Sequence, residues 1–294
     1  MKEKKPHNKK KTAAVLIPAA AILIFAIPGL WQGLTVRRCT LGSEKLSAPV
    51  RAALITDLHS CRYGKHQEKL IRAVREESPD LVLLAGDIFD DKRDDLKTEE
   101  FISGIAPDYP CFYVTGNHEY WATEEAYDQK MAILEKYGVH VLHDRMESIE
   151  INGQVLTIAG LDDPDAALDF QYRRGGSLYE GNLPEALSNL DLRRDPEAYS
   201  ILLSHRPELF PLYRETGFDL VVSGHAHGGQ WRLPFLQNGL LAPHQGLFPK
   251  YSGGLFSEND VTMIVSRGLA RESTIVPRFY NPPELVIIDL KPGE

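Results

Sequence analysis

The chain has 294 residues, of which 43% are hydrophobic and 25% charged, the composition of a globular protein with a sizeable core. Six of its 33 basic residues lie within residues 1–12, so the rest of the chain is more acidic than the net charge of −8 indicates. An acidic body repels phosphate backbones, and we expect no nucleic-acid partner.

A continuous apolar segment follows the lysine-rich head of residues 1–12. Residues 13–30 are interrupted only by two prolines and reach the lower limit for spanning a bilayer. Trp31 ends the segment, where interfacial aromatic residues occur, and the preceding lysines place the N-terminus in the cytoplasm. We predict a transmembrane anchor within residues 13–34 of a cell-membrane protein whose remaining domain is extracytoplasmic. A cleaved signal peptide and a buried core helix are the alternatives.

Residues 35–50 have no clear periodicity and are predicted to be a linker into one domain, residues 51–294. Apolar runs alternate with amphipathic segments there, which indicates an α/β fold. Asn152-Gly153 between two alternating runs predicts a tight hairpin. The predicted strands span residues 51–56, 80–85, 111–115, 139–142, 148–151, 154–159, 200–203, 219–223, 261–266 and 284–290. The predicted helices span residues 66–77, 97–105 and 123–137.

Polar side chains follow five of the predicted strands at equivalent positions. Taken singly, each could be a helix cap, a turn residue or a surface group. In open α/β sheets, however, the carboxyl ends of strands meet at one edge, where ligands bind. We therefore expect one site that contains Asp57, His59, Asp87, Asn117, His118, His205, His225 and His227.

The chemistry of these side chains indicates metal ions. Carboxylates, an amide oxygen and imidazoles without a thiolate suit Mn²⁺, Fe or Zn²⁺. The set is too large for a single ion. Two divalent ions about 3.5–4 Å apart that share a carboxylate would use it fully, and such pairs catalyse in-line phosphoryl displacement.

The order of these motifs resembles that of the calcineurin-like metallophosphoesterases over residues 51–290. The longer strings at 116–121, 160–163 and 224–230 resemble a bacterial membrane-associated subgroup, the YkuE/YaeI-like phosphodiesterases, although alanine stands at 226 where that subgroup often has threonine. The motifs that carry the resemblance are Asp57-x-His59, Gly86-Asp87-x-x-Asp90, Gly116-Asn117-His118-Glu119, His205 and Gly224-His225-x-His227.

The resemblance implies a four-layer α/β/β/α sandwich for residues 51–294, the metallophosphoesterase domain. It also implies two divalent metal ions, with manganese favoured and iron or zinc as alternatives. By resemblance, the first ion is held by Asp57, His59 and His227, the second by Asn117, His205 and His225, and Asp87 bridges both.

The resemblance implies a catalytic role for His118 and Asp87. A hydroxide between the ions would attack phosphorus, with Asp87 as the bridging ligand. His118 would not be a ligand but would stabilise the transition state or protonate the leaving oxygen. Glu119 and Asp90 are the two candidates to assist it.

The substrate is expected to be a phosphorylated small molecule or lipid of the cell envelope. The apolar loop 233–248 could admit acyl chains, or it could simply pack on its own domain. Arg62, Arg173 and Arg174 are candidates for phosphate contacts, or solvated surface groups. A UDP-2,3-diacylglucosamine-type pyrophosphate hydrolase is an alternative whose cytoplasmic reaction conflicts with the predicted orientation. A catalytically silent binding protein is disfavoured because no motif residue is missing.

Overall fold

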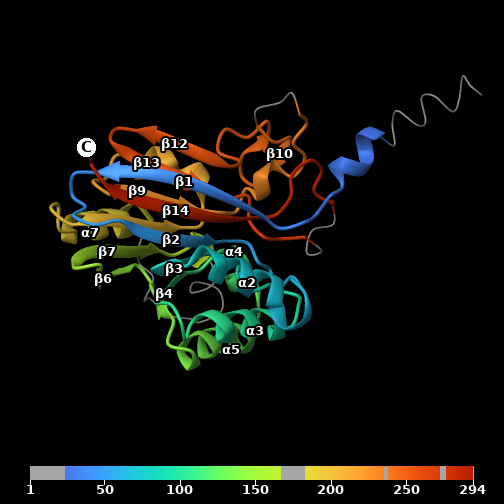
Figure 1. Cartoon of the computed structure of the whole chain (residues 1–294), viewed down its shortest axis with the longest axis horizontal. Coiled ribbons are helices and arrows are strands. Elements are labelled where there is room, and N and C mark those ends of the chain that lie inside the picture. The colour runs from blue at the N-terminus through green and yellow to red at the C-terminus, as the bar shows by residue number, and fades with distance from the viewer. Residues whose placement is uncertain (1–23, 167–182, 235–237, 272–275, 294) are drawn as a thin grey trace, which may run out of the picture.

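The computed structural model describes residues 24–166, 183–234, 238–271 and 276–293, and Figure 1 shows two sheets packed face to face with helices outside them. The first sheet has the order β1 (Thr35–Ser43), β14 (Glu284–Pro292), β2 (Val50–Ile55), β3 (Leu81–Ala85), β4 (Cys111–Val114) and β5 (His140–Val141). The second has the order β12 (Gly254–Glu258), β13 (Val261–Val265), β9 (Leu220–Ser223), β8 (Tyr199–Ser204), β7 (Gln154–Leu161) and β6 (Arg145–Ile151).

Short helices and a small hairpin complete the described fold. The helices are η1 (Lys65–Gln67), α2 (Glu68–Glu77), α3 (Leu96–Ile105), α4 (Asn117–Trp121), α5 (Glu124–Lys136), α7 (Leu183–Arg193), η2 (Pro207–Leu209), α8 (Phe210–Tyr213) and η3 (His227–Gly229). The hairpin pairs β10 (Leu241–Ala242) with β11 (Gly246–Leu247) inside the predicted loop 233–248. The predicted hairpin around Asn152-Gly153 is confirmed as β6 and β7.

The central strands are apolar on both faces because each sheet is covered on both sides. Leu54 and Leu83 of the first sheet meet Ile201 of the second in the core between the sheets. The alternate residues of the first sheet pack under α2, α3 and α5, and those of the second under α7 and α8. This arrangement is the predicted four-layer α/β/β/α sandwich.

The prediction of a linker at residues 35–50 is wrong for its first half. Residues Thr35–Ser43 form β1, which runs parallel to β14 in a register from Thr35–Glu284 to Ser43–Pro292. An edge strand is only half buried, so β1 lacks the continuous apolar run that marks the central strands. Its consecutive arginines bind acidic partners instead, Arg37 with Glu284 and Arg38 with Glu77.

The predicted transmembrane helix at residues 13–34 is not supported. In the part of the chain that the structure describes, which begins at residue 24, no helix is long and apolar enough to cross a membrane. Residues 24–29 are helical, but residues 31–34 are extended and lead into β1. The remainder of the predicted segment lies outside the described residues.

Candidate metal centre

The predicted ligands lie in the loops that follow the parallel strands β2, β3 and β4 of one sheet and β8 and β9 of the other. These loops turn abruptly, and most of the ligands have a positive backbone φ, which few residues other than glycine adopt. Such backbone conformations concentrate at functional sites, where the surrounding structure holds them in place. The ligands with positive φ are Asp57, His59, Asp87, His225 and His227.

Two clusters of ligand atoms result, and Asp87 stands between them. Asp57, His59 and His227 form one cluster, and Asp87, His205 and His225 form the other, each with its ligand atoms within 4.8 Å of one another. One oxygen of Asp87, Oδ2, is 3.1 Å from Nε2 of His205 and 3.5 Å from Nε2 of His59. Asp87 therefore has the position that a bridging ligand requires.

Several ligand atoms are buried without a hydrogen-bond partner. They include Oδ2 of Asp57, the amide oxygen of Asn117 and Nδ1 of His227. A buried polar atom that lacks a partner is costly, and native structures normally satisfy it. Oxygen and imidazole donors of this kind suit divalent cations, so the residues present fit a pair of metal ions.

Glycines make room for the carboxylates. A Cβ added to Gly116 would lie 2.3 Å from Oδ1 of Asp87, and one added to Gly268 would lie 2.5 Å from Oδ2 of Asp57. Gly268 also has a φ of +72°, which other residues rarely adopt. The motifs predicted Gly116, but nothing near Gly268 in the sequence indicates that it lies against a ligand.

The buried histidines of the site have pKa values shifted in opposite directions. Burial would lower the pKa of His205, but the charges of Asp87 and Asp57 outweigh burial and raise the pKa to about 10. Burial dominates at His227 and lowers its pKa to about 3, which leaves a neutral imidazole able to bind a metal. Cation binding would replace the proton on His205, because imidazole ligands bind metals in the neutral form.

His118 lies beside the clusters and is paired with a carboxylate that the motifs did not predict. Its Nδ1 is 2.6 Å from Oδ1 of Asp91, and its ring stands edge-on to that of His59 at 4.4 Å between centroids. Asp90 instead lies 3.3 Å from Nδ1 of His59. The carboxylate paired with His118 is thus Asp91, whereas the two that the resemblance offered for this place, Asp90 and Glu119, bind His59 and the backbone of the ligand loops. In the sequence, only the position of Asp91 next to Asp90 indicates that Asp91 lies near His118.

Glu119 holds the backbone of the ligand loops. Its carboxylate accepts hydrogen bonds from the backbone N–H groups of Gly116 at 2.8 Å and of Asp87 and Phe89 at 3.1 Å. Burial, followed by the charge of Asp87, raises its pKa to about 7. Glu119 therefore fixes the loop that carries Asp87 and makes no contact with His118 through its side chain.

A buried ion pair supports the second cluster. Arg206, directly after His205, donates from Nη2 to Oδ1 of Asp163 at 2.7 Å. Its Nη1 lies 3.3 Å from Nε2 of His225 and 2.7 Å from Nδ1 of His244, whose ring stacks on that of His225. His244 comes from the β10–β11 hairpin, and no sequence pattern predicted it here.

The arginines predicted to contact phosphate gain no support. Arg62 donates from Nε to the carbonyl of Gly64, two residues along the chain. Arg173 and Arg174 lie outside the residues that the structure describes.

Comparison with known proteins agrees with this geometry. The sequence profile of the calcineurin-like phosphoesterases matches residues 50–229. The chain is 31% identical over 281 residues to an uncharacterized metallophosphoesterase of Campylobacter jejuni, covering 94% of this chain and 68% of the relative. It is also 31% identical over 265 residues to one of Aquifex aeolicus, covering 88% of this chain and 92% of the relative. The chain therefore belongs to the calcineurin-like phosphoesterases and is a hydrolase of phosphoester bonds.

Proposed function

We propose that this protein is a dinuclear, manganese-favouring phosphodiesterase that acts on a lipid-linked or other cell-envelope phosphate at a membrane. The observation that carries the dinuclear site is the position of Asp87 between two clusters of ligand atoms. Carboxylate, amide and imidazole ligands without a thiolate suit Mn²⁺, Fe or Zn²⁺, and the family resemblance favours manganese among them.

The residues of the site divide into metal ligands and a proton donor. One ion would be held by Asp57, His59 and His227, the other by Asn117, His205 and His225, and both by Asp87. When bound, the ions supply Lewis acidity and lower the pKa of water at the site. Gly116, Gly224 and Gly268 let the backbone approach closely enough to orient the carboxylates.

His118 is placed to move a proton. Because its Nδ1 is paired with Asp91, its Nε2 is the nitrogen left to face substrate. Asp91 fixes the orientation of the ring. His118 would then protonate the leaving oxygen of the phosphoester.

The membrane setting is supported by where the N-terminal segment enters the fold. β14 runs antiparallel to β2, with Val286 opposite Leu54, and β1 runs parallel to β14. The beginning of β1 thus lies at the sheet edge where β2 ends and Asp57 follows. An N-terminal anchor preceded by lysines would hold this edge near a membrane, with the domain on the extracytoplasmic side.

The function is tested by metal-dependent turnover. The full chain is stripped of metal, supplied separately with Mn²⁺, Fe²⁺ or Zn²⁺, and offered bis(p-nitrophenyl) phosphate, envelope lipids and nucleotide-sugar pyrophosphates, with products identified by mass. We expect hydrolysis of the diester only with metal, fastest with Mn²⁺. A metal-loaded protein that hydrolyses none of these compounds would support the silent binding protein instead.

Asp90 and Asp91 should differ in what they affect. Asp91→Asn should lower kcat by about a hundredfold at saturating metal, because His118 loses the carboxylate that holds it. Asp90→Asn should instead weaken metal affinity by about 10–100-fold, since Asp90 pairs with His59. Turnover measured against metal concentration separates the two effects, and an equal loss of kcat in both variants at saturating metal contradicts these roles.

A further inference from the structure

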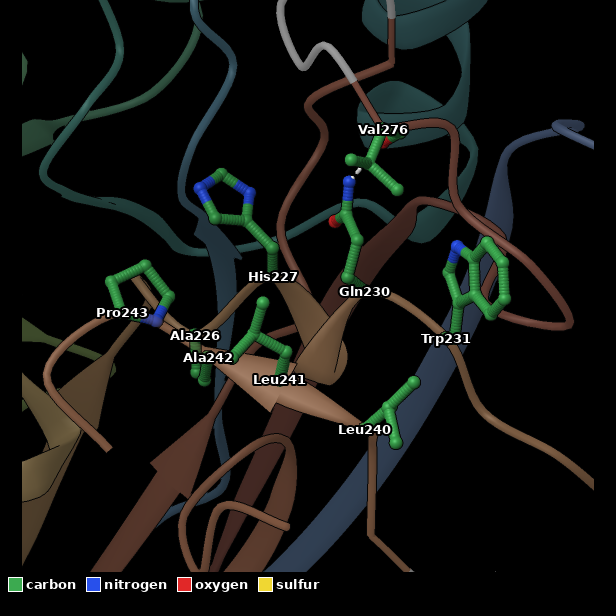
Figure 2. A pocket seen from close by; sticks show the side chains of 9 residues that line it. All are labelled: Ala226, His227, Gln230, Trp231, Leu240, Leu241, Ala242, Pro243 and Val276. Atoms are coloured by element: carbon green, nitrogen blue, oxygen red, sulfur yellow. Dashed lines mark hydrogen bonds between the residues drawn. The ribbon is translucent and has the colours of Figure 1, made fainter. Parts of the chain in front are cut away.

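An apolar pocket opens directly beside the predicted metal ligands. It has a volume of about 610 Å³, within the usual range of about 300–1,000 Å³ for small-molecule sites. Figure 2 shows the imidazole of His227 on one side of this pocket and the indole of Trp231 on the other, with Leu241 below. Because His227 belongs both to this wall and to the first cluster, the pocket adjoins the metal centre.

Two polar side chains in the wall already donate hydrogen bonds to backbone carbonyls. The Gln230 amide donates to the carbonyl of Val276, and the Trp231 indole N–H donates to the carbonyl of Pro277 at 3.0 Å. Apart from the imidazole of His227, the remaining wall is hydrocarbon, chiefly from Leu240 and Leu241. A ligand here would find apolar contacts and few free hydrogen-bond donors.

Exposed apolar side chains belong to the pocket wall or lie next to it. Leu241, Leu247 and Phe248 of the β10–β11 hairpin region are 53%, 67% and 62% exposed. Trp231 is 40% exposed and lies 5.7 Å, between ring centroids, from Phe279. Large exposed apolar patches mark interaction sites in soluble domains.

The apolar rim continues into the N-terminal segment. Phe279 also contacts Phe25, with ring centroids 5.9 Å apart, and the backbone N–H of Tyr280 donates to the carbonyl of Gly29. Trp31, at the end of that segment, is 56% exposed. The pocket, its rim and the segment that the sequence predicts to be anchored thus lie on one side of the domain.

We propose that this pocket binds the hydrocarbon chain of an amphiphilic phosphoester while the phosphate lies at the metal centre, and that the rim rests on the lipid surface that supplies the substrate. The proposal rests on the proposed phosphoesterase function. The apolar wall and the apolar rim favour a hydrocarbon chain as the ligand. The shared His227 places that chain next to the site for the phosphate. The structure assigns to Leu241 and Trp231 a role in choosing substrates by chain length.

The test measures kcat/KM of the full-length protein with Mn²⁺ on p-nitrophenyl alkyl phosphates whose alkyl groups are methyl, butyl and octyl. Each buried methylene can raise affinity by up to about fourfold, so kcat/KM should rise at least about tenfold from methyl to octyl. Leu241→Arg should reduce the octyl-to-methyl ratio to within about twofold of one, and Trp231→Ala should lower it as well. Leu192→Arg, on α7 at a residue 80% exposed, is the matched control and should leave the ratio unchanged.

The ratio is taken on one preparation, so it does not depend on the fraction of active protein. Calorimetric binding of octyl phosphate and methyl phosphate to the metal-free chain supplies a readout without turnover, and octyl binding should show the negative heat-capacity change of apolar burial. If kcat/KM is equal for all three alkyl groups and octyl phosphate binds no more tightly than methyl phosphate, the proposed role of the pocket is wrong. The proposed phosphoesterase function would be unaffected. If the protein binds octyl phosphate selectively but hydrolyses no ester, the proposed function is wrong, whereas the proposed role of the pocket in binding a hydrocarbon chain stands.

Discussion

Asp87→Asn should lower kcat on a phosphodiester by about a thousandfold or more at saturating Mn²⁺. The substitution keeps the shape of the side chain but removes a charge that lies against both clusters. Burial alone would raise the pKa of Asp87, but the charges of His205 and His118 outweigh it and hold that pKa well below its usual range, so the native group is a carboxylate. Lewis-acid stabilisation by metal is worth several kcal/mol, and about 1.4 kcal/mol corresponds to tenfold in rate.

The measurement pairs initial rates with bound metal per chain. Asp195→Asn makes the same change of charge at an exposed residue and serves as the control. We expect Asp87→Asn to bind less than the two ions of the native protein, whereas the control binds both and turns over normally. Activity of Asp87→Asn within tenfold of the native rate would show that no ion depends on this carboxylate.

Asp163→Asn should destabilise the fold by about 3 kcal/mol, as measured by urea unfolding. Asp163 and Arg206 are 1% and 3% exposed, and removing one partner of a buried pair typically costs about 3–5 kcal/mol because the other charge stays buried. The lower end is expected because Asp165 and Glu208 lie 3.3 and 3.7 Å from the guanidinium and compensate in part.

A double-mutant cycle separates the pair from its surroundings. Arg206→Met alone leaves Asp163 buried without its cation, whereas the double variant Asp163→Asn with Arg206→Met removes both charges. The double variant should be more stable than the sum of the single losses predicts, with a coupling of at least about 1 kcal/mol. Additive losses would mean that the pair is not the reason for the instability.

The central strands and the ligands could be predicted because two independent patterns coincide in them. A strand covered on both faces must be apolar throughout, so β3 and β8 stand out, and the chain breaks where they end. Buried polar residues at those breaks, such as Asp87 and His205, would destabilise the fold unless they bound a partner. These two patterns therefore identified the central strands and the polar residues that follow them, whereas the four layers and the division of ligands between two ions came from the family resemblance.

Other features have no local signature. β1 is an edge strand whose partner, β14, lies about 250 residues later, so its pairing depends on tertiary structure alone. Gly268 and His244 reach the site from loops that carry no motif, through backbone geometry that periodicity does not encode. Asp90 and Asp91 have the same chemistry, and only the direction of each side chain decides which one meets His118.

The parallel pairing of β1 with β14 determines how the protein is oriented when it is attached to a surface through one end of the chain. Each strand spans nine residues, about 30 Å, so the chain's C-terminal end emerges that far from where the N-terminal segment enters (Figure 1). A surface coupled through residue 293 would hold the domain with its catalytic loops facing outward. Coupling through the N-terminal segment would turn the same loops toward the support, and the two immobilised forms should differ in their access to bulky substrates.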